Sequence, residues 1–284
     1  MGQLDGKVAI VTGATSGIGE RIAELFVAEG ARVVAAGRRT EEGKALETRC
    51  GDALSFIRTD VAVETDVKAM IDHAVTRFGR LDCLVNNAGS GAPMVSIAEV
   101  TAEQFDTVFG VNVRGVMFGI KYAAPVMLRQ GSGSIITIGS AAGLRGGFGG
   151  HVYGASKAAA IHLSRSAASE LARGGVRVNS ISPGGIVTGI FAKTAGVQGS
   201  DADRVLGVVA DRFATVQPIP RAGVASDIAQ AAVFLASDAA SFITGQDLAV
   251  DGGFVPFGKF GWEESVEIRA ELSRLVRAEI AKGT

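Results

Sequence analysis

Two side chains at the start of a helical pattern could transfer a proton. Tyr153 and Lys157 stand four residues apart, a spacing that places both on one face of a helix. The ordinary pKa of a phenol is about 10 and must fall by about three units, or roughly 4 kcal/mol, for proton exchange near neutral pH. A neighbouring ammonium favours the phenolate, so Lys157 would make Tyr153 a general acid or base. The only other tyrosine, Tyr122, has no lysine four residues later.

Ser140 and Asn112 are polar residues that the same chemistry could use. Ser140 follows an apolar run and precedes Tyr153, a position at the carboxyl edge of a sheet, where ligands bind. Each residue alone also has a structural explanation: a packed tyrosine, a solvated lysine, a serine that caps a turn, or an interior asparagine with a partner. Ser140 shifts the balance toward a catalytic site, because it ends a strand at the edge where a ligand is expected.

A glycine-rich run, Thr12-Gly13-Ala14-Thr15-Ser16-Gly17-Ile18-Gly19, lies between the first apolar run and a helical pattern. Glycines at a strand-to-helix turn let the backbone approach a pyrophosphate, whose charge the free amides at the helix N-terminus favour. Such a run also occurs as a simple tight turn. Its place after the first strand favours a nucleotide-binding loop.

Seven apolar runs rich in Val and Ile alternate with amphipathic patterns along the chain. They predict strands over residues 8–11, 32–36, 54–57, 81–85, 134–138, 176–181 and 248–250, and helices over 18–28, 65–78, 105–127, 155–171 and 227–235. The alternation predicts an α/β fold: a doubly wound parallel sheet of about seven strands with helices on both faces (Rossmann). We expect one domain over residues 1–253.

Composition excludes several other classes of protein. The 284 residues are 47% apolar, and 28 basic against 29 acidic residues give a formal charge of −1, which offers no general attraction to nucleic acid or to an anionic membrane surface. No apolar run is long enough to span a bilayer. Cys50 and Cys83 lack the spacing of a zinc site or a disulfide framework, and the three histidines lack ligand spacing. We expect a cytoplasmic protein without metal.

The TGxxxGxG spacing and several later motifs resemble the short-chain dehydrogenase/reductase family over about residues 4–253. The motifs are Asp60-Val61, Asn86-Asn87-Ala88-Gly89, Asn112, Ser140, Tyr153, Lys157, Asn179, Pro183-Gly184 and Thr188. The resemblance implies a hydride-transferring oxidoreductase with the catalytic tetrad Asn112, Ser140, Tyr153 and Lys157. Tyr153 would exchange the proton, Ser140 would hold the substrate oxygen, Lys157 would bind the nicotinamide ribose, and Asn112 would hold a relay water.

The same resemblance, with the glycine loop, predicts the cofactor site. Its residues are Gly13, Thr15, Ser16, Gly17, Ile18, Gly19, Arg38, Arg39, Asp60, Val61, Asn87, Ala88, Gly89, Tyr153, Lys157, Pro183, Gly184, Ile186 and Thr188. Asp60 and Val61 would lie beside the adenine and Thr188 beside the nicotinamide carboxamide. NAD-binding Rossmann proteins place an acid at the end of the second strand. Here Gly37 stands there, followed by two arginines that suit a 2′-phosphate, so we predict NADP; NAD remains the alternative, because such an arginine also stacks on adenine.

Loops after the fourth, fifth and sixth strands should line the substrate cleft. The predicted substrate residues are Gly91, Met94, Ser140, Phe148, His151, Tyr153, Gly185, Ile190 and Phe191. They are mostly small or apolar, which favours a medium-sized, weakly polar ketone or secondary alcohol. The alternatives are an NAD-dependent alcohol or sugar dehydrogenase of the same family, or a non-catalytic NADP-binding regulator.

Two segments lie outside the strand and helix alternation. Residues 189–220 carry Val205, Val208, Val209 and Phe213 at helical spacing and resemble the family's substrate lid, although a plain surface helix has the same pattern. Residues 254–284 extend beyond the end of most relatives. Their apolar stripe, Ile268, Leu272, Leu275, Val276 and Ile280, needs a partner surface, and we predict a helix at the interface of a homo-oligomer, commonly a tetramer in this family.

Overall fold

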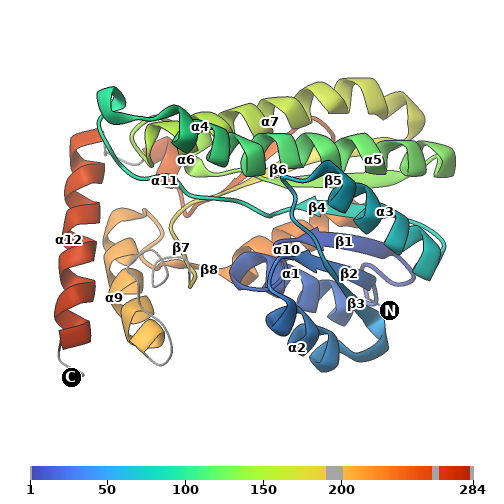
Figure 1. Ribbon diagram of the computed structural model, residues 1–284, viewed down its shortest axis with the longest axis horizontal. Coiled ribbons are helices and arrows are strands. Elements are labelled where there is room, and N and C mark those ends of the chain that lie inside the picture. The colour runs from blue at the N-terminus through green and yellow to red at the C-terminus, as the bar shows by residue number, and fades with distance from the viewer. Residues whose placement is uncertain (1, 190–200, 258–261, 282–284) are drawn as a thin grey trace.

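The fold is a seven-stranded parallel sheet between two layers of helices. The computed structural model describes residues 2–189, 201–257 and 262–281. The strands are β1 (Val8–Thr12), β2 (Arg32–Gly37), β3 (Leu54–Arg58), β4 (Cys83–Asn86), β5 (Gly133–Ile138), β6 (Val176–Pro183) and β9 (Asp247–Val250). They lie in the order β3-β2-β1-β4-β5-β6-β9 (Figure 1). The predicted doubly wound sheet is confirmed. A second, two-stranded sheet of β7 (Ile186–Val187) and β8 (Gly223–Val224) was not predicted.

The alternation of side chains along each strand builds two cores, one on each face of the sheet. Helices α1 (Gly17–Ala28), α2 (Thr40–Cys50) and α10 (Ala225–Ala236) cover one face. Helices α3 (Glu64–Phe78), α5 (Gly115–Gln130) and α7 (His151–Leu171) cover the other. Sequence patterns missed α2, because it is largely polar and buries only Gly43 and Leu46.

The helix predicted over residues 105–127 is present, with an interruption that was not predicted. Helical backbone runs without a break through α4 (Ala102–Phe109), a π-helical segment (Gly110–Arg114) and α5. A π-helical turn takes up more residues than an α-helical turn, and it interrupts the i to i+4 ladder, frequently at functional sites. The segment contains Asn112, which is almost completely buried.

The order of strands reverses between β1 and β4. The chain leaves β1 toward β2 on one side and continues from β4 toward β5 on the other. In an open α/β sheet this switch point leaves a crevice outside the carboxyl ends of the strands, and ligands bind there. The glycine loop follows β1 and Ser140 follows β5 at this edge.

The C-terminal extension packs on the predicted lid in the same chain. Helices α9 (Asp201–Val216) and α12 (Trp262–Ala281) lie side by side at the left of Figure 1, and the short α11 (Phe254–Phe257) precedes α12. Their small core consists of Val205, Val209, Leu272 and Val276, with Val187, Phe213 and Ile268 packed around it. The predicted stripe therefore has a partner surface in α9, and a role at an oligomer interface stays a prediction. The side chain of Ile280 lies outside the described residues.

Among the described residues, no helix has the length and apolar content to cross a membrane.

Replacing Leu272 by Ala should weaken the packing of α12 on α9 without unfolding the sheet. Leu272 is buried in the α9–α12 core, which is separate from the two sheet cores, and truncating a buried leucine costs about 2–5 kcal/mol. Hydrogen exchange should accelerate across Trp262–Ala281 while the thermal midpoint of the sheet changes little. Arg274→Ala, at an exposed position on the same helix, is the matched control. Equal exchange in both variants would contradict this packing.

Candidate active site

Three of the predicted catalytic residues meet at the carboxyl end of β5. Ser140 follows this strand, and its side chain lies close enough to the hydroxyl of Tyr153, near the start of α7, to lower the pKa of the phenol. Lys157 stands one turn further along α7, with Nζ 5.9 Å from the centroid of the Tyr153 ring. This buried amine donates a hydrogen bond to the carbonyl oxygen of Ile138 at 2.7 Å. The structure thus brings Ser140, Tyr153 and Lys157 together as predicted.

Asn112 connects the loop after β4 with the helix that carries Tyr153. Its Oδ1 accepts from the amide of Ser90 at 2.7 Å, and its Nδ2 donates to the carbonyl of Ser90 and to Oγ of Ser156, both at 2.9 Å. Ser156 Oγ in turn donates to the carbonyl of Tyr153 at 2.8 Å. A Cβ on Gly89 would lie 3.5 Å from both Asn112 Oδ1 and Lys157 Nζ, so the backbone of Gly89 lies next to both side chains.

The pKa of Tyr153 shifts upward, whereas the sequence prediction was a lowered pKa. Burial raises the pKa of Tyr153, and this effect outweighs the hydrogen bond with Ser140 and the charge of Arg269, which both lower it. Burial also lowers the pKa of Lys157 from 10.5 to about 8. The chain's own groups therefore keep the phenol protonated near neutral pH, the form that donates a proton.

The glycine loop has a shape that only glycine allows at several positions. Gly13 and Gly17 have φ values of +66° and +59°, and a Cβ on Gly19 would overlap Asn87 Nδ2 and the carbonyl of Gly13. Ser16 is the N-cap of α1, and its side chain makes no capping hydrogen bond, which leaves amides of the first turn for a ligand. This cradle fits the pyrophosphate of a dinucleotide.

Hydrogen bonds of Asn87 and Thr12 hold the glycine loop in place. Asn87 Nδ2 donates to the carbonyl of Thr12 at 2.8 Å, and Thr12 Oγ1 accepts from the amides of Asn87 and Ala88 at 2.9 and 3.0 Å. Thr12 Oγ1 also donates to Val85 at 3.2 Å, which ties β1 to β4. Asn87 therefore shapes the loop in addition to its predicted place beside the cofactor.

The predicted adenosine side lies at the ends of β2 and β3. Arg39 donates from Nε and Nη2 to Oγ1 of Thr15 in the glycine loop, at 3.2 and 3.0 Å. The Arg38 side chain is 67% exposed and lies 3.9 Å from the carboxylate of Asp60. Val61 is buried and packs under Gly115.

The predicted nicotinamide side follows β6. Gly184 donates to the carbonyl of Val250 at 3.1 Å, and a Cβ on it would overlap Asp251, so this glycine with the buried Pro183 fixes the end of the strand. Thr188 lies against Gly17: a Cβ on that glycine would be 3.5 Å from Cβ of Thr188. Ile186 is buried, and Ile18 packs partly against the core.

The predicted substrate loops come together around Tyr153. A Cβ on Gly149 would lie 3.1 Å from the Tyr153 ring, and one on Gly150 would overlap the carbonyl of Pro93. The loop that contains Gly91 and Met94 therefore borders the loop that contains Phe148 and His151. His151 is half-buried at the first turn of α7. Gly185 is covered by Phe213 of α9. Ile190 and Phe191 lie outside the described residues.

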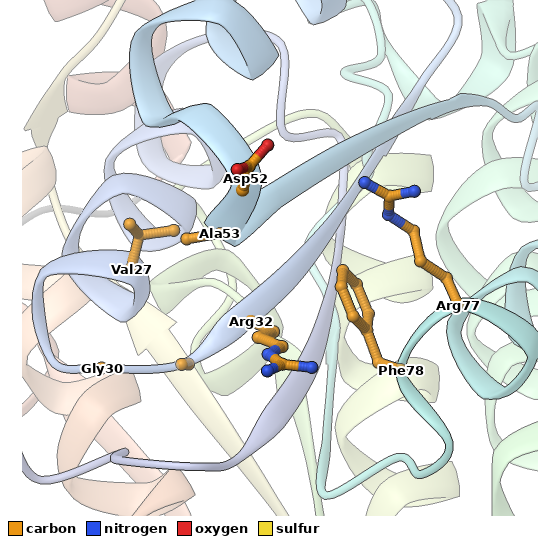
Figure 2. Close-up of a pocket in the computed structure, with 8 residues that line it drawn as sticks. Val27, Gly30, Arg32, Asp52, Ala53, Arg77 and Phe78 are labelled. Carbon is orange, nitrogen blue, oxygen red and sulfur yellow. The ribbon is translucent and has the colours of Figure 1, made fainter.

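An open cavity of about 540 Å³ lies at the opposite edge of the sheet, at the starts of β2 and β3. Figure 2 draws the residues that line it and labels Val27, Gly30, Arg32, Asp52, Ala53, Arg77 and Phe78. The guanidinium carbons of Arg32 and Arg77 lie 5.8 and 5.5 Å from the centroid of the Phe78 ring. No predicted site residue lines this cavity, and ligands of parallel sheets bind at the carboxyl edge. It is not part of the catalytic site.

Sequence reasoning missed several residues that shape the site. Thr12 and Ser156 act through their hydroxyl groups, and Gln217 accepts from the amide of Gly185 through Oε1 at 2.9 Å. A threonine before the glycine loop and a serine before Lys157 are visible in the sequence, but nothing there shows which partners they reach. Arg269 was missed because it lies far from every motif along the chain.

The comparisons with known proteins agree with this geometry. Residues 13–255 match the sequence model of a family described as enoyl-(acyl carrier protein) reductase. Momilactone A synthase of Oryza sativa subsp. japonica is 43% identical over 255 residues, which cover 88% of this chain and 90% of the relative. (+)-Borneol dehydrogenase 2 of Salvia officinalis is 43% identical over 258 residues, with coverages of 89% and 90%. Xanthoxin dehydrogenase of Arabidopsis thaliana is 38% identical over 258 residues, also with 89% and 90%.

The matched region begins at Gly13 of the glycine loop, contains all four tetrad positions and ends close to the start of the C-terminal extension. It includes the strands from β2 to β9 of the parallel sheet and the catalytic edge, and β1 lies just before it. The chain therefore belongs to the short-chain dehydrogenase/reductase family and is an NAD(P)-dependent oxidoreductase that acts on alcohol or carbonyl groups.

Proposed function

We propose that this enzyme uses NADP to interconvert a medium-sized, weakly polar ketone and its secondary alcohol. The observation that carries the proposal is the grouping of Ser140, Tyr153 and Lys157 at the carboxyl end of β5, beside a glycine loop shaped for a dinucleotide. A nicotinamide bound there supplies or accepts the hydride.

In the direction of reduction, Tyr153 donates its hydroxyl proton to the carbonyl oxygen of the substrate. Ser140 holds that oxygen by a hydrogen bond where negative charge develops. The ammonium of Lys157 lies close to the phenol and stabilises the phenolate that remains after the transfer. Asn112 and Ser156 hold the backbone of Tyr153 in place. In oxidation, the phenolate takes the proton from the alcohol.

The end of β2 supports NADP over NAD. Gly37 occupies the position where an acid would bind the ribose hydroxyls of NAD, and a Cβ there would lie 2.9 Å from Thr15 Cγ2. A larger side chain would displace Thr15 from the glycine loop. The Arg39 guanidinium already lies at this loop, and Arg38 is exposed next to it. NAD is the alternative, because both arginines already have acidic neighbours in the chain. Arg38 lies near Asp60, and Arg39 lies near Glu42.

The lining of the cleft supports a substrate with an apolar body. Phe148 stacks on Phe254 with ring centroids 4.2 Å apart, and Met94 lies in the neighbouring loop. Two relatives carry the names (+)-borneol dehydrogenase and xanthoxin dehydrogenase. A sugar would need more polar side chains in the lining to bind its hydroxyl groups. A screen of cyclohexanone and 2-decalone against fructose, with NADPH, tests this class; faster turnover of fructose would favour a sugar dehydrogenase.

We further propose a cytoplasmic homotetramer. Cys50 and Cys83 are free thiols, which supports a reducing compartment. The large apolar side chains of Phe105, Met117 and Leu128 are exposed on α4 and α5 and support assembly with further copies of the chain.

Tyr153→Phe should abolish turnover and leave cofactor binding intact. The change removes only the hydroxyl that exchanges the proton, and general acid catalysis contributes about 10²–10⁴-fold to rate. Tyr122→Phe is the matched control, because Tyr122 is the only other tyrosine and its hydroxyl binds Glu64 away from the site. Steady-state rates and NADPH fluorescence titrations measure both effects. A parent chain that binds NADPH and turns over no carbonyl compound would instead favour the regulator.

The rate of ketone reduction should decline above about pH 8. Lys157 has a pKa lowered to about 8, so its amine is charged below this pH and neutral above it, while the raised pKa of Tyr153 keeps the phenol protonated. Losing the ammonium removes the charge that stabilises the phenolate. Profiles of kcat/KM for reduction between about pH 6 and pH 10 measure this dependence. A rate that stays constant across this range would contradict the role of Lys157.

Arg38→Gln should weaken NADPH binding by roughly ten- to a hundredfold and change NADH binding little, because hydrogen bonds to a charged phosphate contribute about 1.5–3 kcal/mol. Fluorescence titration of both cofactors measures the two dissociation constants. Arg173→Gln, at an exposed position after α7, controls for the loss of one positive charge. An equal loss of affinity for both cofactors would show that Arg38 stacks on the adenine and does not bind the 2′-phosphate of NADP.

A further inference from the structure

The C-terminal extension starts with a turn that fixes the direction in which the chain leaves β9. Gly252 and Gly253 have φ values of +61° and +84°, in the left-handed region that favours glycine. The carboxylate of the buried Asp251 accepts from the amides of Gly253 and Val255, at 2.9 and 2.6 Å. A carboxylate that binds nearby amides of its own chain in this way stabilises a turn. Phe254 lies between these two amides and is therefore held in a fixed place.

Phe254 packs on the loop after α6 (Ala141–Leu144), which leads to the catalytic phenol. Its ring stacks on the ring of Phe148, with centroids 4.2 Å apart and an angle of 25° between the ring planes. Arg145 of the same loop adds a second link. Its Nη1 donates to the carbonyl of Val255 at 3.2 Å, and its guanidinium carbon lies 5.3 Å from the centroid of the Phe148 ring. In Figure 1, α11 accordingly lies beside α6.

This loop offers the rest of the protein a single side chain by which to hold it. Residues 146–150 read Gly-Gly-Phe-Gly-Gly, so Phe148 has the only side chain larger than a hydrogen atom in five consecutive positions. Glycine loses more conformational freedom on folding than any other residue, so a segment of this kind needs a contact to order it. An aromatic stack is such a contact, because it favours particular arrangements of the two rings. The ring of Phe254 supplies it here.

The ordered loop forms part of the wall beside the catalytic phenol. A Cβ on Gly149 would lie 3.1 Å from the Tyr153 ring, so the backbone next to Phe148 lies against this ring. Gly149 and Gly150 are buried, whereas Phe148 and Phe254 are half-buried. The aromatic pair thus keeps some apolar surface accessible near the phenol, and a bound substrate can cover it.

We propose that Phe254 is a positioning residue that determines substrate specificity, because its stack holds the ring of Phe148 beside Tyr153 as an apolar wall. The wall favours a ketone that carries a second apolar ring beyond the ring of its carbonyl group. The C-terminal extension thereby takes part in selecting the substrate. This inference rests on the proposed function, since it concerns the apolar body of the substrate whose carbonyl oxygen Ser140 and Tyr153 hold.

Hydrogen exchange of the full chain, without cofactor or substrate, tests the positioning. Phe254→Leu keeps an apolar side chain and removes the ring, so the amides of residues 145–150 should exchange about three- to tenfold faster, as the loss of an aromatic pair implies. Phe257→Leu is the matched control, because Phe257 is 72% exposed on the same short helix. Phe254→Tyr keeps the ring, and its loop should exchange as in the parent chain.

The ratio of kcat/KM for 2-decalone to kcat/KM for cyclohexanone, with NADPH, tests the specificity. Both ketones present the same group to Tyr153, and only 2-decalone has a second ring to lie against Phe148. Phe254→Leu should lower this ratio about tenfold, mainly through a higher KM for 2-decalone, because contacts of single methylene groups discriminate by about that factor or more. Phe254→Tyr and Phe257→Leu should keep the ratio of the parent chain.

The outcomes separate this inference from the proposed function. If the parent chain binds neither NADP nor NAD, or reduces neither ketone, the proposed function and the specificity fail together, and the exchange of residues 145–150 alone decides whether Phe254 holds the loop. Unchanged exchange in Phe254→Leu, or equal acceleration in Phe257→Leu, refutes the positioning. Faster exchange with an unchanged ratio refutes the specificity, because Phe148 then forms no wall for the substrate. A ratio that falls equally in Phe254→Tyr also refutes it, because the ring is then not what selects the substrate.

Discussion

The hydrogen bond from Lys157 to the carbonyl of Ile138 is the interaction on which the catalytic site depends. It holds an amine that is 6% exposed between β5 and α7. Removing an ammonium from water is costly, and the cost appears as a pKa lowered to about 8. The carbonyl oxygen of Ile138 at the strand end accepts a hydrogen bond from this amine, which compensates part of that cost. Because Tyr153 lies one helical turn earlier, fixing the amine also fixes the phenol against Ser140.

The irregular segment before α5 supports the same arrangement from the other side. In a continuous α-helix each residue advances by about 100°, so one extra residue in a turn rotates the following side chains. The π-helical segment contains Asn112, whose amide binds both backbone groups of Ser90. The same amide reaches Ser156 on α7. A local departure from α-helical geometry thus joins the loop after β4 to the catalytic helix.

The sheet and the tetrad could be predicted from the sequence, whereas their surroundings could not. Buried parallel strands are continuous runs of Val and Ile, and the spacing of Tyr153 and Lys157 is set by one helical turn. Helix α2 has no clear apolar face, so its sequence does not predict a helix. The apolar stripe on α12 predicts that this helix packs on a partner, but it does not indicate that the partner is α9. The pKa of Tyr153 depends on how deeply the phenol is buried, which no local pattern encodes.

A small core between α9 and α12 holds the C-terminal extension against the predicted lid. Its residues belong to neither of the two cores that hold the sheet, so the strand ends that position Ser140 do not depend on this packing. The ion pair of Arg212 with Glu271 joins the two helices further. The two helices therefore form one packed unit beside the sheet, whereas the catalytic edge is built on the cores of the sheet itself.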